Sequence, residues 1–495
     1  MLAAGFAYVA QTAPAAANPP ATFNPVVEAE NFSITQQRQT IYDTPRYQAQ
    51  LAADSASSTA QALATEAGDP GRFFTDDLCW NLSNGCAGDI RLNNWATNGY
   101  GIVRPVLFTA RDGATISGHV WATVAGPAKR PGIVITDGSV QADENMYWYA
   151  AQTLAKAGYV VLTFDPQGQG QSDTFGQSPD QNEGVPAQTS GTPFYDGTED
   201  AIDFFLSTPS HPYEPVPSCT TGTSHAAKQN ARVAAGLDAG FNPLWKLLDP
   251  SFGVGLAGHS YGAAGVSYIG QWDPRVKAIV AWHNLGGPGP DDSPVPGAAP
   301  GAPSQTIGES GCPADPADRT TVPITKPALG MSADYGLPPA PNTSLPDPNA
   351  KSTWSLNYSK AGVDTGEIII RGGSHLDFSF IPNQAFGASL RGPDLIDWYT
   401  TAWFDKYLKH DPTADTRLLS DRWRNDPVEA EIDPNHDGNA FSFYYWSRLD
   451  IHLANGKVWD CEDLRDGCPG MVPESDDGYP GTCSYIAIDT SPDRG

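Results

Sequence analysis

Short apolar runs alternate with helix-like segments from about residue 103 to residue 373, and this alternation limits the fold more than any other feature. Five of the runs are short and continuous, as strands covered on both faces are. They are YVVLTF (159–164), GVGLAG (253–258), VKAIVAW (276–282), PALGMS (327–332) and GEIIIRGG (366–373). Strands that alternate with helices predict an α/β fold with a mostly parallel sheet and helices on both faces.

The first part of this region predicts a hairpin followed by a βαβ unit. The strand-like runs 103–110 and 114–124 flank a turn at Asp112-Gly113, and PGIVIT (131–136) reads as a buried strand. Helices are expected over 142–158, which ends at a glycine, and over 197–207.

Two long segments interrupt the alternation, 208–250 and 286–323, and the second is rich in Pro and Gly. Long segments without periodicity inside a compact domain are commonly lids or binding loops. We therefore expect lid-like insertions near a substrate site, and a loop flap in the second.

The two ends of the chain differ from the middle. Residues 1–17 combine an apolar run with a small-residue ending, Ala15-Ala16-Ala17, and are interpreted as a signal-peptide remnant, although the basic n-region is missing. We expect an N-terminal extension over 18–100, with an Ala-rich helix at 47–68, and a C-terminal extension over 412–495. No later run is long and apolar enough for a membrane span.

The composition narrows the class of partner. The chain of 495 residues holds 29 Lys and Arg against 56 Asp and Glu, a formal charge of -27. A surface of this sign repels phosphate backbones and anionic lipid headgroups, which argues against a nucleic-acid partner. An acidic surface also suits a neutral or apolar substrate better than an anionic one.

Seven cysteines are present, and two pairs share one local spacing, Cys79 with Cys86 and Cys461 with Cys468. Without a His-rich or second C-x-x-C element nearby, the spacing predicts small disulfide-closed loops rather than zinc sites, and so an oxidising, extracellular location. Cys219 and Cys312 lie in the two insertions and are a possible third pair, which leaves Cys483; sequence alone does not fix these pairings.

The stretch FGVGLAGHSYGAAG (252–265) places Ser260 between glycines at a predicted strand-to-helix junction. A serine on so sharp a corner is lifted clear of the sheet, and small neighbours are needed because the backbones approach closely there. Ser260 is therefore predicted to be a nucleophile, although a chance match is possible in a chain with 50 glycines.

A serine nucleophile needs a base, and His375 follows the last predicted strand, where it can reach back over the sheet edge. His283, directly after the strand-like run 276–282, is the competitor, with a substrate-contact or supporting role as its alternative. His259 adjoins the serine and is expected to point elsewhere.

Asp334 is the predicted carboxylate partner of that base, because it follows a strand and gives the chain order Ser, Asp, His. The alternative is an ordinary turn residue at 334, with Asp291 or Asp292 supplying the carboxylate. Asp377 is too close to His375 in sequence.

Two backbone N–H groups are expected to bind the oxyanion of a tetrahedral intermediate. Tyr261, directly after the nucleophile, supplies one. The loop VITDGSVQ (134–141) supplies the other, with Gly138 allowing a close approach and Ser139 as donor.

Taken together, the region from about 103 to 410 resembles the α/β-hydrolase superfamily. GHSYG with Ser260, SAD with Asp334, GGSH with His375, the TDGS loop and GYVVLTFDPQGQGQSD (158–173) carry the resemblance. It implies an eight-stranded, mostly parallel, doubly covered sheet in a catalytic domain over 101–411. It also implies ester or amide hydrolysis through an acyl-enzyme by Ser260, Asp334 and His375. The chain departs from the family where many members carry His-Gly and it has Asp137-Gly138.

The C-terminal extension holds Asp433, Asn435, Asp437 and Gly438 at the spacing of the first half of an EF-hand-like calcium loop, but the twelfth position is Tyr444. We expect a polar turn there, with calcium as the weaker alternative.

The sequence thus predicts a secreted serine hydrolase that cleaves small-molecule or polymeric carboxylic esters and needs no cofactor. A serine peptidase or amidase on the same fold is the first alternative. A catalytically silent member that binds a polymer or partner is the second.

Overall fold

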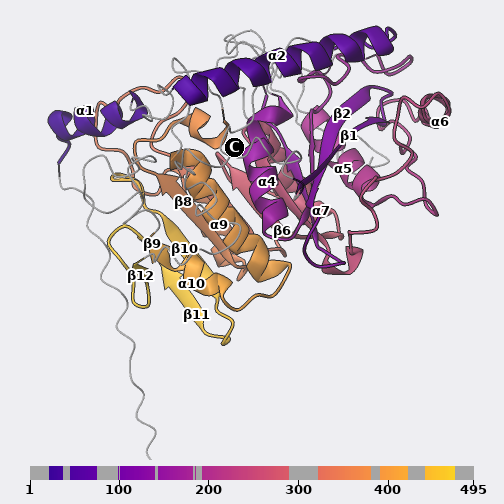
Figure 1. Cartoon of the computed structure of the whole chain (residues 1–495). Helices are drawn as coiled ribbons and strands as arrows, with labels where there is room; N and C mark the ends of the chain where they lie inside the picture. Colours follow the sequence, from indigo (N-terminus) through magenta and orange to yellow (C-terminus); the bar gives the residue numbers. More distant parts are fainter. Residues whose placement is uncertain are drawn as a thin grey trace, which may run out of the picture.

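The fold is described from a computed structural model (Figure 1). The residues that it describes are 22–36, 45–74, 99, 101–139, 143–181, 184, 192–288, 322–380, 391–421 and 441–473.

A single large sheet forms the centre of the described structure. Its strands lie in the order β1-β2-β4-β3-β5-β6-β7-β8-β10-β11. Their bounds are β1 Gly101–Thr109, β2 Thr115–Thr123, β3 Gly132–Thr136, β4 Val160–Phe164, β5 Val254–His259, β6 Val276–Trp282, β7 Ala328–Ala333, β8 Thr365–Ile370, β10 Arg448–His452 and β11 Val458–Cys461. The strands from β4 through β8 in this order are parallel, and β1, β2, β10 and β11 pair antiparallel. The mostly parallel α/β sheet is as predicted.

The sheet has ten strands in the described part of the chain, not the expected eight. The two additional strands come from the C-terminal extension, where β10 pairs with three residues of β8 and β11 pairs with β10. A second, two-stranded sheet joins β9, Ser420–Asp421, to β12, Val472–Pro473. The residues after 412 thus continue the sheet from β8, which would otherwise be an open edge.

Helices cover both faces of the sheet. The bounds are α4 Trp148–Lys156 and α9 Arg391–Tyr407 on one face, and α5 Thr192–Leu206, α7 Tyr261–Trp272 and α8 Thr353–Lys360 on the other. Short α10, Ala414–Leu418, packs against α9. The helix expected over 142–158 begins as the 3-10 turn Glu144–Tyr147, and the one expected over 197–207 starts earlier, at 192.

The core consists of two apolar layers, one on each side of the sheet. Ile133 and Ile135 of β3 pack toward α4 and α9, whereas Val134 packs toward α5 and α7. Successive side chains of a strand point to opposite faces, so a strand buried on both faces needs an unbroken apolar run. This is why GIVIT is buried at every position.

The insertion 208–250 lies at the outer edge of the sheet. Ala239 N–H donates to Leu107 O of β1 at 2.8 Å, and Tyr213 Oη donates to Thr109 O at 2.9 Å. Its end pairs with Arg130, just before β3, and it contains helix α6, Ala226–Ala234. These contacts join the segment to the edge strand β1 and to the amino end of β3, and the expectation of a lid near the substrate site stays a prediction.

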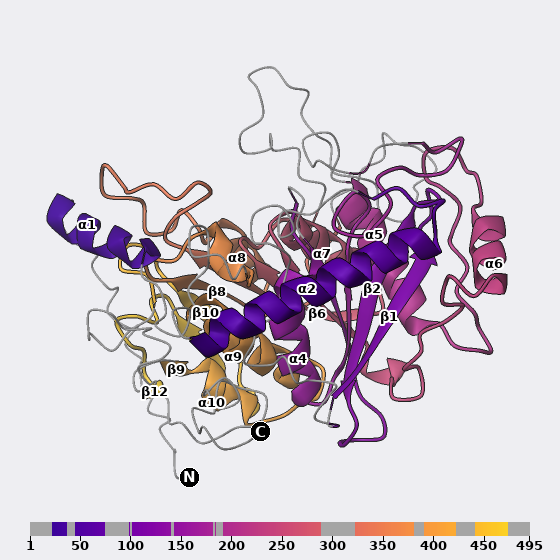
Figure 2. The same cartoon turned by 45° about the horizontal axis from the view of Figure 1, so that its top comes forward.

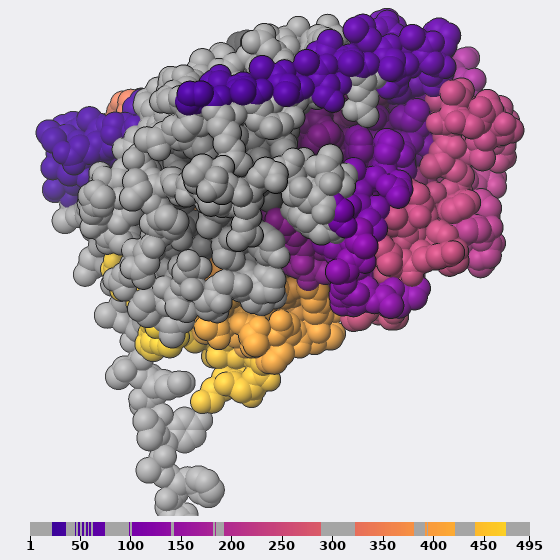
Figure 3. Space-filling model, viewed as in Figure 1, coloured from indigo at the N-terminus to yellow at the C-terminus, as the bar shows by residue number. Residues whose placement is uncertain are grey.

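The N-terminal extension contributes two helices, α1 Pro25–Ser33, followed by the 3-10 turn Ile34–Gln36, and α2 Pro45–Gly68. The second confirms the Ala-rich helix expected at 47–68. Helix α2 runs as a single rod on the outside of the molecule, from the side of α1 to the side of α6 (Figures 1 and 2), and its flank is visible in the space-filling view (Figure 3). At the carboxyl end of α2, Asp69 forms an ion pair with Arg232, in which Asp69 Oδ2 and Arg232 Nη2 are 2.5 Å apart.

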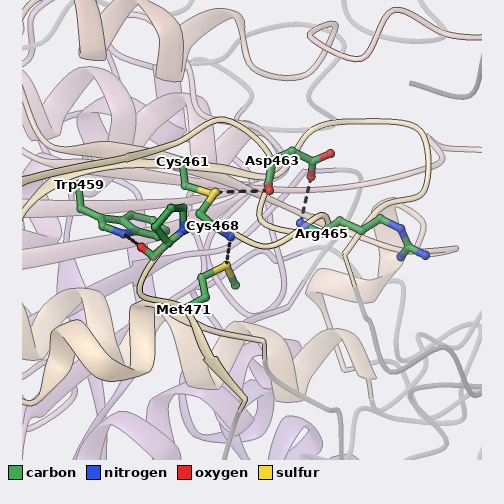
Figure 4. The surroundings of a disulfide bond; sticks show 7 residues. Trp459, Cys461, Asp463, Arg465, Cys468 and Met471 are labelled. Carbon is green, nitrogen blue, oxygen red and sulfur yellow. Dashed lines mark hydrogen bonds between the residues drawn. A yellow bond between two sulfur atoms is a disulfide. The ribbon is translucent and has the colours of Figure 1, made fainter. Parts of the chain in front are cut away.

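Cys461 and Cys468 form a disulfide, as predicted, which closes the turn after β11 (Figure 4). Around it, Trp459 Nε1 donates to Pro469 O at 2.7 Å, and Asp463 Oδ1 accepts from Arg465 N–H at 3.0 Å. The Cys461 side chain is fully buried in the layer under α4 and α9. The bridge therefore anchors the added strands to the core.

Several predictions concern residues outside the described ranges. They are the signal remnant 1–17, the pair Cys79 and Cys86, Cys312, Cys483, Asp291, Asp292, most of the 286–323 segment, and the calcium candidates Asp433, Asn435 and Asp437. Cys219 is disulfide-bonded.

Removing the Cys461–Cys468 bridge should lower stability. The bridge joins residues seven positions apart, and closing so short a loop is worth about 2 to 3 kcal/mol through the unfolded state. We expect the double variant Cys461→Ala, Cys468→Ala to lose that much free energy of unfolding in urea titrations. The matched control is Glu462→Ala, at an exposed position within the same loop, and a bridge variant as stable as this control would contradict the expectation.

Candidate active site

Ser260 occupies the corner between β5 and α7 with φ 56° and ψ -118°. The non-glycine residues with positive φ in the described ranges are Ser260, His283 and His410. Such conformations are strained for a residue with a Cβ and are retained where the surrounding structure enforces them. Two of the three lie at the carboxyl ends of the adjacent strands β5 and β6.

The glycines of the GHSYG motif are explained by backbone contacts. A Cβ at Gly258 would lie 2.5 Å from Gly262 O, and a Cβ at Gly262 would lie 2.3 Å from Asp137 O. No side chain fits at either place. The corner therefore brings the strand β5, the start of α7 and the loop after β3 into direct backbone contact.

The loop after β3 reaches Ser260, as the sequence predicts. A Cβ at Gly138 would lie 3.3 Å from Ser260 Cβ. The N–H of Gly138 donates to Tyr147 Oη at 3.2 Å, so it already has a partner. Ser139, the predicted oxyanion donor, follows it and is partly exposed, and Tyr261, the other predicted donor, is the first residue of α7.

Asp137, where the chain departs from the family pattern, is 1 % exposed and neither of its carboxylate oxygens has a hydrogen-bond partner within the described structure. Burial raises the pKa of Asp137 well above its usual value, and the neighbouring carboxylates of Asp165 and Glu144 raise it further. The raised pKa favours the neutral form of this carboxyl group. The loop backbone is supported instead by Gln169, whose Nε2 donates to Gly138 O at 3.1 Å.

His375 starts the 3-10 turn His375–Phe378 directly after the loop that follows β8. Ser374 caps this turn, and Asp377 Oδ2 accepts from Ser374 N–H at 2.6 Å, so Asp377 serves the turn itself. Burial lowers the pKa of His375 to about 4, and the positive charge of Lys351 acts in the same direction. The ring is therefore neutral, as a general base must be.

Nδ1 of His375 lies 2.8 Å from Nδ1 of His283, and the ring centroids are 4.6 Å apart. His283 follows β6 directly, with its backbone N–H donating to Met331 O at 2.6 Å. Burial lowers its pKa well below the usual value, and the nearby His375 and Lys351 lower it further. The competitor from the sequence thus contacts the predicted base.

His259 connects three loops of the site, against the expectation that it points elsewhere. Its Nε2 lies 3.0 Å from the carbonyl oxygen of His375, and its Nδ1 lies 2.7 Å from Tyr147 Oη. Burial lowers the pKa of His259 well below its usual value, so the ring is neutral. A carbonyl can only accept, so Nε2 carries the hydrogen and Nδ1 accepts from the tyrosine hydroxyl.

The resulting chain of hydrogen bonds runs from Gly138 N–H to Tyr147 Oη, from Tyr147 to His259, and from His259 to His375 O. It joins the loop after β3, the residue before Ser260 and the turn that carries His375. Tyr147 and His259 are 1 % and 4 % exposed. Period-two alternation along β5 puts His259 on the same face as the core residue Ala257, which is the signal that sequence reasoning missed.

Asp334 directly follows β7 but is not hydrogen-bonded to His375. Its Oδ2 accepts from Gly372 N–H at 2.7 Å and from Asn31 Nδ2 at 2.9 Å, and its Oδ1 accepts from the Ser442 hydroxyl. The structure thus brings Asp334 to the loop before His375, although the predicted contact with the imidazole is not made. Two of these three partners, Asn31 and Ser442, belong to the terminal extensions.

Helix α1 is part of this network, which the sequence did not indicate. Asn31 also donates to Tyr335 Oη at 3.0 Å, and Glu28 Oε1 accepts from the same hydroxyl at 3.1 Å. Ile34 packs so closely on Gly372 that a Cβ there would lie 2.4 Å away. No local pattern identifies residues that contact the site only through the tertiary fold.

Five residues at the centre of this region share one property. Ser260, Tyr261, Ser139, His283 and His375 are each partly exposed, whereas Tyr147, His259 and Asp334 are buried. No hydrogen bond links the Ser260 hydroxyl to His375 among the described residues. Trp282, the last residue of β6, is fully buried, and its Nε1 donates to Thr400 Oγ1 at 3.1 Å in the layer under α9.

Comparison with known proteins identifies no relative: no protein-family model matches the chain, and no curated protein matches it. Within the described ranges no group of three or more His, Cys, Asp or Glu side chains is placed to hold a metal ion. No helix in the same ranges has the length and apolar character to cross a membrane.

Replacing Tyr147 by phenylalanine should destabilise the protein. The change removes one hydroxyl and leaves Gly138 N–H and His259 Nδ1 without their partner, at about 1 to 3 kcal/mol for each buried group. Urea unfolding of Tyr147→Phe should show this loss. Tyr358→Phe, whose buried hydroxyl is adjacent to Gln271, is the matched control and should lose less stability, because at most one hydrogen bond is removed; equal losses would contradict the hydrogen-bond chain through Tyr147.

Proposed function

We propose that the chain is a secreted serine hydrolase of the α/β-hydrolase type that cleaves carboxylic esters through an acyl-enzyme intermediate. The observation that carries the proposal is the strained corner at Ser260, between a buried parallel strand and a helix, with the Gly138 loop in contact with it. This arrangement matches the nucleophile turn of that family and the position of its oxyanion loop.

In this proposal Ser260 Oγ attacks the acyl carbon while its proton passes to Nε2 of His375. The new bond forms from the Oγ electron pair, and the carbonyl oxygen becomes an oxyanion that accepts from the N–H groups of Tyr261 and Ser139. The protonated His375 then gives its proton to the leaving alcohol, and water repeats the sequence to release the acid. Catalytic hydrogen bonds commonly tighten only with substrate bound, so a separated Ser260 and His375 are compatible with this role.

The electrostatics support a neutral base. The pKa of His375 is lowered to about 4, so the ring is ready to accept a proton at any pH above that value. The formal charge of -27 disfavours anionic substrates. We assign the substrate to neutral small-molecule or polymeric esters for this reason.

Export is proposed from two features, the alanine-rich apolar start of the chain and its disulfides. Disulfides persist in oxidising compartments and are rare in the cytosol.

The first test is covalent labelling. A fluorophosphonate should label the native protein, and Ser260→Ala should abolish labelling and lower kcat for aryl esters by roughly 10⁶-fold. Ser251→Ala, at an exposed serine shortly before β5, is the control and should behave as the native protein. Unlabelled native protein would favour the silent binding alternative, and faster turnover of peptide anilides than of aryl esters would favour the peptidase.

The second test is the pH dependence of kcat/KM on a neutral ester. His375 must be neutral to act, so activity should be constant at neutral pH and fall as the pH drops through about 4. Lys351 lowers the pKa of His375, so Lys351→Gln should move this acid limb to higher pH, whereas exposed Lys360→Gln should not. A limb near pH 6.5 in the native protein would contradict the expectation.

A further inference from the structure

A general base needs a partner that fixes its tautomer, and the residue in contact with Nδ1 of His375 is a histidine. The two Nδ1 atoms are 2.8 Å apart. A ring N–H makes one hydrogen bond at a time at this distance, so Nδ1 of His375 is not available to Asp334 in this arrangement. Asp334, for its part, accepts from Gly372, Asn31 and Ser442.

We propose that His283, not Asp334, is the positioning residue that orients His375, so that nucleophile, base and orienting group are serine, histidine and histidine. The inference rests on the proposed function. In this arrangement Asp334 positions the backbone of the loop before His375 through Gly372 N–H.

Two tautomers satisfy the contact between the rings. If His283 donates, His375 carries its hydrogen on Nε2 and cannot accept the proton of Ser260. If His375 donates from Nδ1 to Nδ1 of His283, Nε2 of His375 keeps its lone pair and can act as the base. In both tautomers Nε2 of His283 is buried without a partner within the described structure, so its environment does not distinguish them. The second tautomer is selected because only there can Nε2 of His375 accept a proton.

The proton transfer balances with His283 unchanged. The Ser260 Oγ–H bond breaks, the proton goes to Nε2 of His375, and the Oγ electron pair forms the bond to the acyl carbon. His375 becomes an imidazolium that still donates from Nδ1, and neutral His283 accepts without taking a proton. The titratable groups that act on the pair are Lys351 and His259, and neither of them is hydrogen-bonded to an Nδ1 atom of the pair in the described structure.

The backbone of His283 limits which substitutions are informative. Its φ is 54°, a conformation that Asn and Asp tolerate better than other non-glycine residues. Asn places an oxygen at the position of Nδ1 and keeps a neutral acceptor. Asp places a negative charge there.

The deciding experiment compares these variants by the acid limb of kcat/KM. His283→Asp should move the limb up by at least about one pH unit, because a carboxylate beside the imidazolium stabilises it. His283→Asn should keep kcat within about tenfold, and Asp334→Asn should leave the limb in place and lower kcat less than about tenfold. His211→Asn, at an exposed histidine, is the matched control.

The opposite pattern overturns the proposal. In that pattern Asp334→Asn loses about 10⁴-fold in kcat, as an enzyme does when its orienting carboxylate is removed, and His283→Asp leaves the acid limb of kcat/KM where it is in the native protein.

A measurement on the native protein covers the case in which a variant does not fold. With the nine histidines labelled with ¹⁵N, a coupling across the hydrogen bond should connect Nδ1 of His375 to Nδ1 of His283. Absence of that coupling overturns the proposal. Native protein that shows the coupling but neither hydrolyses esters nor binds a fluorophosphonate would refute the proposed function instead.

Discussion

The geometry of the site depends on the chain of hydrogen bonds from Gly138 through Tyr147 and His259 to the carbonyl of His375. It fixes the positions of three segments that are far apart in sequence. Because every member is buried or part of the backbone, each lost bond would leave a polar group unpaired in a low-dielectric environment. The same burial keeps His259 neutral, so the direction of every donor in the chain is determined.

A second polar network, centred on Asp334, joins both terminal extensions to the loop that carries His375. Asn31 comes from α1, and Ser442 comes from the segment before β10. In the family that the chain resembles, a carboxylate at this place would contact the catalytic imidazole. Here the imidazole meets His283, and the carboxylate supports backbone and extensions.

The sequence predicted the mostly parallel sheet because burial on both faces requires small or apolar residues at consecutive positions, as at 132–136 and 278–282. It predicted the corner at Ser260 because glycine is required at 258 and 262 for backbone contact. Which polar groups hydrogen-bond to each other was harder to predict from the sequence. Whether Asp334 or His283 contacts His375 depends on a few ångströms of loop geometry, and neither chain order nor spacing encodes that. Absence of periodicity is compatible both with a lid and with cover for an edge strand, so the sequence alone does not determine the role of 208–250.

The contacts of α1 change how the boundary of the functional unit should be drawn. Asn31, Glu28 and Ile34 reach the loops after β7 and β8 directly. The segment 25–36 is thus an integral wall of the site rather than a tethered appendage. A shortened protein that kept only the sheet and its covering helices would lose the contacts that Asn31 and Glu28 make with these loops. A shortened version that keeps the site intact therefore has to begin before β1, at α1.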